Sequence, residues 1–172
     1  MKTSLQQGDR QSLRSLVDAL RHGLQENLWG VVLFGSATRG EAGAESDLDL
    51  LLVADGLPEK FTIRMQYLRQ MVPGEMRSMV SFIAKTRAEF EGSFPSYYLD
   101  IGVDGIILYD REGYMRQKLI RIQELIRLAG LHRRRFDHGF IWEWGKPPTG
   151  PWRIDWSGVY MDSEQADEKE EQ

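Results

Sequence analysis

A chain of 172 residues is long enough to bury one sizeable core, and its length favours a single compact domain. Its composition, with 41% hydrophobic and 28% charged residues, is that of a soluble globular protein and argues against intrinsic disorder. The absence of cysteine excludes disulfides and thiolate metal sites and predicts a reducing, cytoplasmic setting. No apolar run approaches the roughly 20 residues that cross a bilayer, so we expect neither a membrane span nor export.

The formal net charge of −4 is unevenly distributed along the chain. Residues 162–172 carry six acidic side chains and one lysine, a local charge of −5, which leaves +1 on everything before them. Because the main body is nearly neutral, the charge pattern argues against binding of bulk DNA. The acidic segment cannot bury apolar surface, and we expect it to be a disordered tail.

Residues 1–130 alternate between helical and strand patterns. Leucine and valine recur at helical spacing between Leu13 and Leu28 and predict an amphipathic helix that covers a sheet. Two apolar runs, Trp29 to Phe34 and Leu48 to Ala54, predict adjacent buried strands. Helical spacing from Phe61 to Val72 predicts a second covering helix.

The alternation continues in the second half of this region. The run from Arg77 to Ala84 predicts a third strand, and a capping-box pattern at Thr86 to Glu89 predicts the start of a short helix. We expect a fourth strand from Ile101 to Tyr109 and a helix from Met115 to Ile126 that Gly130 ends. This order predicts an α/β or α+β domain, a mixed sheet flanked by helices.

Residues 131–161 interrupt the regular pattern with proline, glycine and most of the tryptophans. The tryptophans of this segment are Trp142, Trp144, Trp152 and Trp156. We expect an irregular but ordered appendage that packs on the sheet domain, because so many aromatic rings seldom stay in water. The alternative is that these rings stack on a base or on an acceptor molecule.

The turn after the first predicted strand has the chemistry of a phosphate site. A strand that stops at Gly35 and Ser36 leaves backbone N–H groups free, and the glycine lets a phosphate approach the main chain. Ser36 adds a hydroxyl donor, and Arg39 can form paired hydrogen bonds with phosphate oxygens. We therefore predict a loop that binds a triphosphate.

Two aspartates begin the next strand. Asp47 and Asp49 are two residues apart, so both carboxylates project from one face of the strand. Their mutual repulsion favours a divalent cation, and Mg²⁺ suits carboxylate, phosphate and water oxygens. Two such ions about 4 Å apart would bind a leaving pyrophosphate and activate a hydroxyl. A glycine-serine turn or an aspartate pair alone is common, but their ordered combination between two apolar strands is far more specific.

The combined motif resembles the DNA polymerase β-like nucleotidyltransferases, and among them the minimal nucleotidyltransferase group. The signature of that group is present as Gly35-Ser36, Arg39-Gly40 and Ser46-Asp47-Leu48-Asp49-Leu50. The order of predicted helices and strands from about residue 10 to residue 110 is compatible with the fold of that family.

The resemblance implies a role for each matching residue. Asp47 and Asp49 would bind Mg²⁺ or Mn²⁺, Gly35 and Ser36 would hold the nucleotide phosphates, and Arg39 would support the loop or the triphosphate. The implied reaction is transfer of a nucleoside monophosphate from NTP to a hydroxyl acceptor, which is a small molecule, a protein or an RNA end. Members of the minimal group often work beside a helical HEPN protein as its antitoxin, which implies a HEPN partner.

The family's third acidic residue, which helps to bind metal and accepts the acceptor proton, is missing from its expected place. Ser81 stands there, on the third predicted strand, and a serine hydroxyl is a poor base. Glu75, Asp100 and Asp104 are the acidic residues that could substitute. General-base assistance is typically worth about 10²- to 10⁴-fold, so its loss would slow turnover without preventing nucleotide binding. The second hypothesis is therefore a catalytically weak or inactive nucleotide-binding module, an antitoxin-type partner of a HEPN protein.

The remaining polar clusters carry less information. His132 and the arginines Arg133 to Arg135 follow the last predicted helix, where cations compensate the helix dipole, and contact with RNA or an acidic partner is the alternative. The histidines have no spacing that predicts a metal site or a catalytic triad.

Overall fold

The computed structural model describes residues 7–40, 47–136 and 139–161. The predicted acidic tail at 162–172 lies outside these ranges, as do the residues from Glu41 to Ser46 that precede the aspartate pair. In chain order the elements of the sheet domain are α1 (Gln7–Leu24), η1 (Gln25–Asn27), β1 (Leu28–Phe34), α2 (Ser36–Arg39), β2 (Leu48–Ala54), α3 (Phe61–Met71), η2 (Gly74–Met76), β3 (Val80–Lys85), α4 (Arg87–Glu91), α5 (Tyr97–Asp104), β4 (Ile106–Asp110) and α6 (Tyr114–Ala129). After α6 follow β5 (Leu131–Phe136), β6 (Gly139–Trp144), β7 (Trp152–Ile154) and β8 (Val159–Met161).

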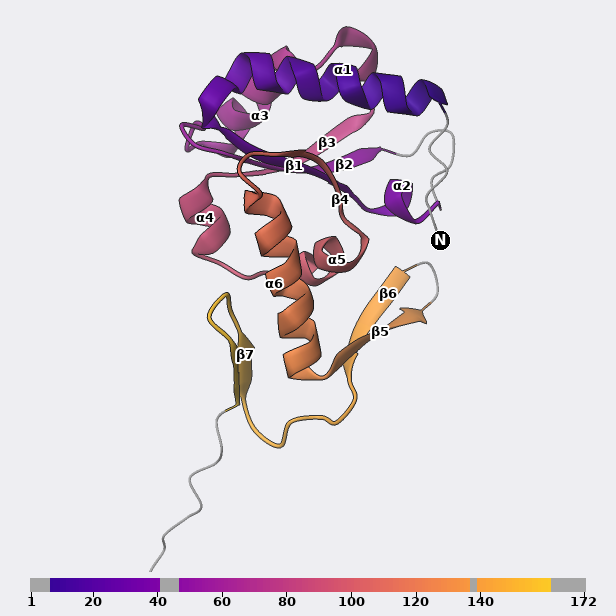
Figure 1. The fold of residues 1–172 in the computed structure, drawn as a ribbon, viewed down its shortest axis with the longest axis vertical. Coiled ribbons are helices and arrows are strands. Elements are labelled where there is room, and N and C mark those ends of the chain that lie inside the picture. The colour runs from indigo at the N-terminus through magenta and orange to yellow at the C-terminus, as the bar shows by residue number, and fades with distance from the viewer. Residues whose placement is uncertain (1–6, 41–46, 137–138, 162–172) are drawn as a thin grey trace, which may run out of the picture.

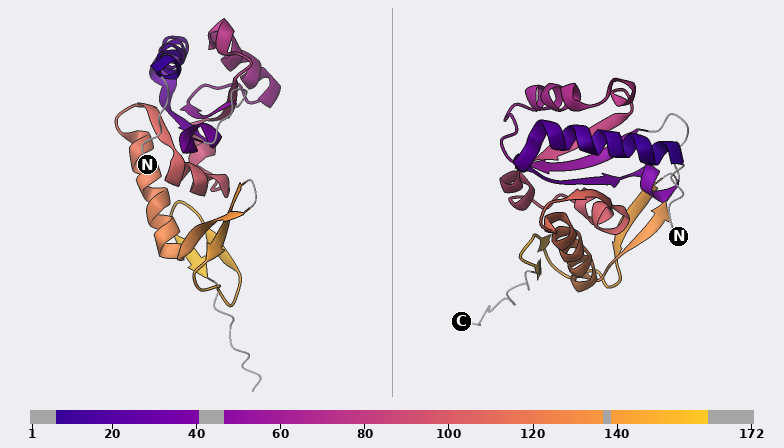
Figure 2. Two further views of the ribbon diagram at one scale, coloured as in Figure 1. Left: turned by 90° about the vertical axis from the view of Figure 1, so that its right-hand side faces the viewer. Right: turned by 45° about the horizontal axis from the view of Figure 1, so that its top comes forward.

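The centre of the fold is a mixed four-stranded sheet in the order β3-β2-β1-β4 (Figure 1). β1 runs antiparallel to both β2 and β4, whereas β2 and β3 are parallel. Figures 1 and 2 show α1 and α3 on one side of the sheet and α5 and α6 on the other. The predicted mixed α/β architecture is thus confirmed.

The two faces of the sheet support two hydrophobic cores, because neighbouring side chains along a strand point in opposite directions. Leu50 and Leu52 of β2 are fully buried beneath α1 and α3. Leu51 and Val53 are equally buried on the opposite face, against α5 and α6. Asp49 has the same parity as Leu51, so its carboxylate belongs to the face that carries α5 and α6.

The main helices and strands lie close to where the sequence predicts them. β2 has the predicted bounds, and the capping box at α4 is present, with Thr86 Oγ1 accepting from the backbone N–H of Glu89 at 3.1 Å. Gly130 ends α6 in the left-handed conformation, as expected of a glycine at a helix C-terminus. The third strand is shorter than predicted, because the residues from Arg77 to Met79 form a turn.

The predicted strand from Ile101 to Tyr109 is wrong in its first half, which belongs to helix α5. A short, mostly apolar segment fits a buried helix as well as a strand, so its pattern could not decide between them. Gly102 explains the helix: a Cβ there would come closer than 3.0 Å to the side chain of Ile122, so the glycine lets α5 pack tightly against α6. Gly105 then ends the helix, and β4 begins one residue later.

The expected irregular appendage at 131–161 is instead formed by two β-hairpins. β5 carries a run of basic residues with no apolar alternation, so its pattern did not predict a strand. Cross-strand pairing explains it: Arg134 makes hydrogen bonds of 2.7 to 3.0 Å to Glu143 of β6. Both hairpins lie at the C-terminal end of α6 (Figure 2).

Within the described ranges, no helix combines the length and the apolar character needed to span a bilayer.

Candidate nucleotide site

The predicted phosphate loop connects β1 to the short helix α2. Gly35 has φ 79° and ψ −154°, a conformation that is essentially restricted to glycine. The Thr38 hydroxyl, buried in the turn, donates to the carbonyl oxygen of Gly35 at 2.9 Å and fixes the loop. Gly40 ends the helix in the left-handed region, at φ 71°.

Asp49 faces this loop directly. A Cβ on Gly35 would lie closer than 3.0 Å to Oδ2 of Asp49, so the carboxylate occupies the space that a larger residue would need. Asp49 pairs with Phe34 at the end of β1, which brings the turn and the carboxylate together. The glycine is therefore required both for the backbone conformation and for the position of the acid.

The electrostatics of the pair fit a cation site. Burial raises the pKa of the Asp49 carboxyl, the nearby Asp47 raises it further, and Arg39 acts in the opposite direction. Burial and a neighbouring like charge both disfavour the ionised form of a carboxylate. A cation that binds beside it stabilises the ionised form. Asp47 is exposed to solvent. The two carboxylates provide hard oxygen ligands of the kind that Mg²⁺ prefers.

Ser81 occupies the position beside Asp49 where the family's third acid is expected. The parallel register of β2 and β3 aligns Asp49 with Ser81, so both residues project from the same face. Within the ranges that the structure describes, no group of three or more histidine, aspartate or glutamate side chains is arranged to hold a metal ion.

Two of the three acids considered as substitutes for the missing carboxylate have other roles. Arg133 of β5 forms a bidentate ion pair with Asp104, at 2.6 and 2.9 Å, and a longer contact of 3.3 Å with Asp100. Trp142 Nε1 also donates to Asp100, at 3.2 Å. Glu75 lies in η2, and it does not line the groove that adjoins Asp47.

Arg39 links the phosphate loop to this cluster. Its Nη1 lies 3.5 Å from Oδ2 of Asp104, whose side chain is only 13% exposed. The guanidinium carbon of Arg39 also lies 5.2 Å from the ring centroid of Phe140 in β6, and that of Arg133 lies 4.1 Å from it. The β5–β6 hairpin thus approaches the loop in two ways: Phe140 packs against Arg39, and Arg133 pairs with Asp104, which also contacts Arg39. The sequence contained no signal for this contact, because neither strand of the hairpin was predicted.

The tryptophans of residues 131–161 pack against the domain. Trp156 Nε1 donates to the carbonyl oxygens of Phe90 and Ser93, both at 3.0 Å, and its ring lies 5.1 Å from that of Phe90. Trp144 and Trp152 pack edge to face, 4.7 Å apart. None of these rings lines the groove beside Asp47. Their packing against the domain fits the structural interpretation.

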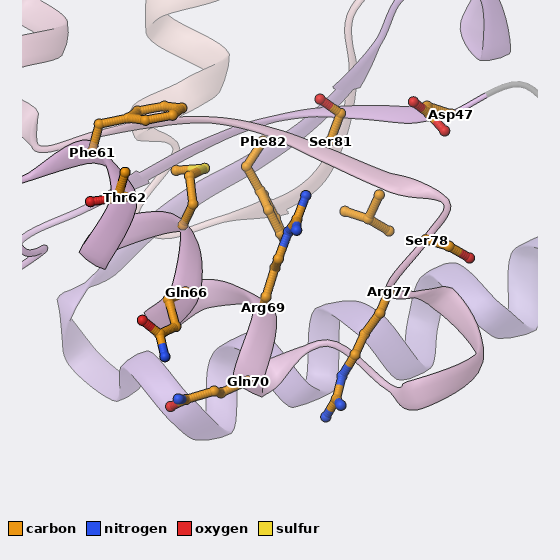
Figure 3. Close-up of a pocket in the computed structure, with 12 residues that line it drawn as sticks. Asp47, Phe61, Thr62, Gln66, Arg69, Gln70, Arg77, Ser78, Ser81 and Phe82 are labelled. Atoms are coloured by element: carbon orange, nitrogen blue, oxygen red, sulfur yellow. The ribbon is translucent and has the colours of Figure 1, made fainter.

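An open groove of about 800 Å³ reaches the site from the outer edge of the sheet. It lies between α3 and β3, with Asp47 and Ser81 at one end and Phe61 and Arg69 along its length (Figure 3). Of the two aspartates, Asp47 lines the groove, whereas Asp49 is not among its lining residues and its carboxylate lies on the opposite face of the sheet.

Comparison with known proteins finds a sequence relative and several solved structures of similar fold. A relative from Methanocaldococcus jannaschii, provisionally named the protein adenylyltransferase MJ1305, is 29% identical over 106 residues, which cover 59% of this chain and 72% of the relative. A chain of a toxin–antitoxin crystal structure with AMP-PNP has a similar fold, with a TM-score of 0.51 at 16% identity over 67% of this chain and 86% of that one. A complex of a tri-AMPylated Shewanella oneidensis HEPN toxin with an MNT antitoxin contains a chain that matches with a TM-score of 0.48 at 14% identity, over 69% and 86% of the two chains.

The comparison with protein families is decisive. The model of the nucleotidyltransferase domain family matches residues 13–127, a segment that contains the four-stranded sheet, the phosphate loop and both aspartates. The match spans more than half of the sequence, and the chain therefore belongs to the nucleotidyltransferase domain family.

Proposed function

We propose that this protein transfers a nucleoside monophosphate, with AMP the first candidate, from NTP to a hydroxyl group on another protein. The observation that carries the proposal is the contact between the Asp49 carboxylate and Gly35, beside the start of α2. It combines an anion-binding turn with a cation-binding acid in one small volume, and transfer from a nucleotide needs both.

Each residue of the site has a distinct role in this proposal. Gly35 and Ser36 bind the nucleotide phosphates through backbone N–H groups and the serine hydroxyl. Arg39 neutralises negative charge on the triphosphate, and its position follows from its contact with Asp104. Asp47 and Asp49 would hold the divalent cation, Mg²⁺ or Mn²⁺. When bound, that cation polarises the α-phosphate and stabilises the leaving pyrophosphate.

The reaction forms one bond and breaks one. The acceptor oxygen bonds to the α-phosphorus, the bond from this phosphorus to the bridging oxygen breaks, and pyrophosphate leaves. The acceptor proton passes to solvent, because the Ser81 hydroxyl is too weak a base to accept it. We therefore expect turnover to be slow for this family, by up to about the 10²- to 10⁴-fold that a general base contributes.

A protein acceptor is favoured by the similarity to the relative from M. jannaschii, whose provisional name is protein adenylyltransferase. A helical HEPN protein is the first acceptor to test, because the motif resembles the minimal nucleotidyltransferase group. A small-molecule or RNA hydroxyl is the alternative acceptor.

The second candidate function is nucleotide binding without transfer, and Ser81 is the observation that favours it. The experiment that separates the two uses purified protein, each NTP labelled at the α-phosphate, Mg²⁺ or Mn²⁺, and cell lysate as the source of acceptors. The control is an Asp47→Asn/Asp49→Asn variant. Label transferred to protein by the wild type alone supports transfer. Metal-dependent NTP binding with no transferred label supports the binding module.

A further inference from the structure

The groove between α3 and β3 has a cationic lining. Two arginines, Arg69 and Arg77, line it, and Asp47 at its end is the one acidic residue among its lining side chains. Figure 3 shows that Arg69 extends from α3 towards β3, and its helix turn is exposed to solvent. Among the residues that the structure describes, no carboxylate forms an ion pair with either arginine. Arg77 Nε donates to the backbone carbonyl oxygen of Val72 at 3.1 Å, so neither of the two charges is neutralised by a described carboxylate, and both can attract an acidic ligand.

The wall of the groove formed by β3 is an open sheet edge. β3 pairs with β2 on one side, and its other side pairs with no strand in the described part of the chain. The edge is closed at Ala84, whose carbonyl oxygen accepts from Arg64 Nη1 at 3.0 Å. The stretch from Val80 to Ile83 keeps backbone groups that can pair with an added strand, which is a common way for a protein to bind an extended peptide.

Apolar side chains beside the edge are unusually exposed. Phe61 at the start of α3 is 70% exposed and lines the groove, and Met79, just before β3, is 43% exposed. Large apolar groups of this kind next to an open strand are typical of a binding surface rather than of a solvated face. They would contact alternate side chains of a peptide on β3.

We propose that this groove binds an extended acidic segment of a protein acceptor, which adds to the edge of β3 and leads a hydroxyl-bearing residue to Asp47. The inference rests on the proposed transfer function and names the class of its acceptor. Ser81 and Asp47 both line the groove, so a segment that pairs along β3 passes beside Asp47. The six residues of β3 correspond to an added segment of about 20 Å.

A protein segment fits this surface better than RNA. An open strand edge offers alternating N–H and C=O groups, which a peptide backbone matches and a sugar-phosphate backbone does not. Only two cations line the groove, whereas single-stranded nucleic acid is usually bound by a basic groove with an aromatic stacking platform. The formal charge of residues 1–161, +1, also gives no general attraction for polyanions.

The test compares two synthetic peptides that contain the same serine, threonine and tyrosine residues and differ only in glutamate or lysine at the flanking positions. Binding is measured by fluorescence anisotropy, and transfer is measured with labelled ATP and Mg²⁺. The variant is Arg69→Gln/Arg77→Gln. The matched control is Arg10→Gln/Arg14→Gln, which removes the same charge from exposed positions on α1, and urea unfolding of each variant checks that it folds.

We expect the glutamate peptide to bind at least about tenfold more tightly than the lysine peptide, a difference of about 1.4 kcal/mol. The groove variant should lose this preference and the α1 control should keep it. A glutamate peptide with N-methylated backbone amides should bind more weakly, because it cannot complete the strand pairing. Equal binding of the two peptides, an unchanged preference in the groove variant, or competition by a single-stranded RNA as strong as that by the glutamate peptide would overturn the proposal.

ATP binding measured in the same samples separates this inference from the function on which it rests. If ATP binds and transfer occurs to other proteins but the glutamate peptide does not bind, the groove assignment is wrong and the transfer function stands. If the peptide binds through Arg69 and Arg77 but ATP does not bind, the surface is a docking site and the proposed transfer is wrong.

Discussion

Replacement of Gly35 by alanine is the substitution that perturbs the site most directly. Two costs combine there. The backbone conformation at φ 79° and ψ −154° is nearly exclusive to glycine and costs other residues about 1 to 3 kcal/mol. The new Cβ would also lie closer than 3.0 Å to Oδ2 of Asp49, so the carboxylate has to move away from the phosphate loop.

Gly40 provides a matched control at the other end of α2. It also has a positive φ, 71°, but no atom lies within 4 Å of the position that its Cβ would take. Gly40→Ala should therefore cost about 1 to 2 kcal/mol of folding stability from the left-handed backbone alone. It leaves the Asp49 carboxylate in place.

Urea unfolding and titration with ATP and Mg²⁺ measure the two effects separately. We expect both variants to lose stability, and we expect Gly35→Ala alone to lose most of its metal-dependent nucleotide binding. A Gly35→Ala variant that binds ATP as tightly as the wild type would refute the assignment of this turn as the phosphate site.

Three further substitutions test other parts of the account. The Arg64 pair lowers the pKa of Glu89 from 4.5 to about 2, so its stabilisation is present above pH 4.5 and is lost as the pH falls towards 2. The Glu89 side chain is 40% exposed, so solvent screening limits the effect. Glu89→Gln should therefore lower the unfolding free energy by about 1 kcal/mol at pH 7 and by less at pH 3. An equal loss of unfolding free energy at the two pH values would contradict this expectation. Asp104→Asn should raise the KM for ATP about fivefold by releasing Arg39, with little change in kcat, and an unchanged KM would show that Asp104 does not position the arginine. Ser81→Asp should raise the transfer rate by about 10²- to 10⁴-fold if a missing base limits turnover, and a rate equal to that of the wild type would contradict that explanation.

The sheet was predictable from the sequence, and the candidate site could be proposed from it, because both depend on local signals. Aliphatic residues on both sides of Asp49, from Leu48 to Ala54, identify β2, and the spacing of Asp47 and Asp49 places both carboxylates on one face. The turn at Gly35 was recognisable because it stands in order with the aspartate pair between two apolar strands, a combination far more specific than either part alone. The register of β2 and β3 then aligns Ser81 with Asp49, as the comparison of motifs predicted.

The parts that sequence reasoning missed depend on contacts between distant segments. The apolar run beginning at Ile101 fits either a strand or a helix, and the close approach of Gly102 to Ile122 selects the helix. From the sequence, Arg133 was interpreted as a solvated cation. Its partners, Asp100 and Asp104, lie about thirty residues earlier in the chain and could not be identified from local pattern. A charged strand is identifiable only when the partner strand that neutralises it is known.

The groove between α3 and β3 could not be predicted from the sequence either. Neither Arg69 nor Arg77 belongs to a motif, and they line one surface only because α3 packs beside β3. Which edge of a sheet stays open follows from strand order, and the pattern of apolar residues does not specify strand order.

We propose that the Gly35 turn and the aspartate pair together form a metal-dependent nucleotide site. Isothermal titration calorimetry with a non-hydrolysable ATP analogue, in the presence of Mg²⁺ or of EDTA, tests it most directly. The variants to compare are Asp49→Asn and Asp18→Asn, since Asp18 is an exposed residue of α1 whose side chain is 73% accessible. We predict Mg²⁺-dependent binding to the wild type and to Asp18→Asn, and at least about a hundredfold weaker binding to Asp49→Asn, which corresponds to about 2.7 kcal/mol. Equal affinity of Asp49→Asn and the wild type, or binding that is unaffected by EDTA, would contradict the account.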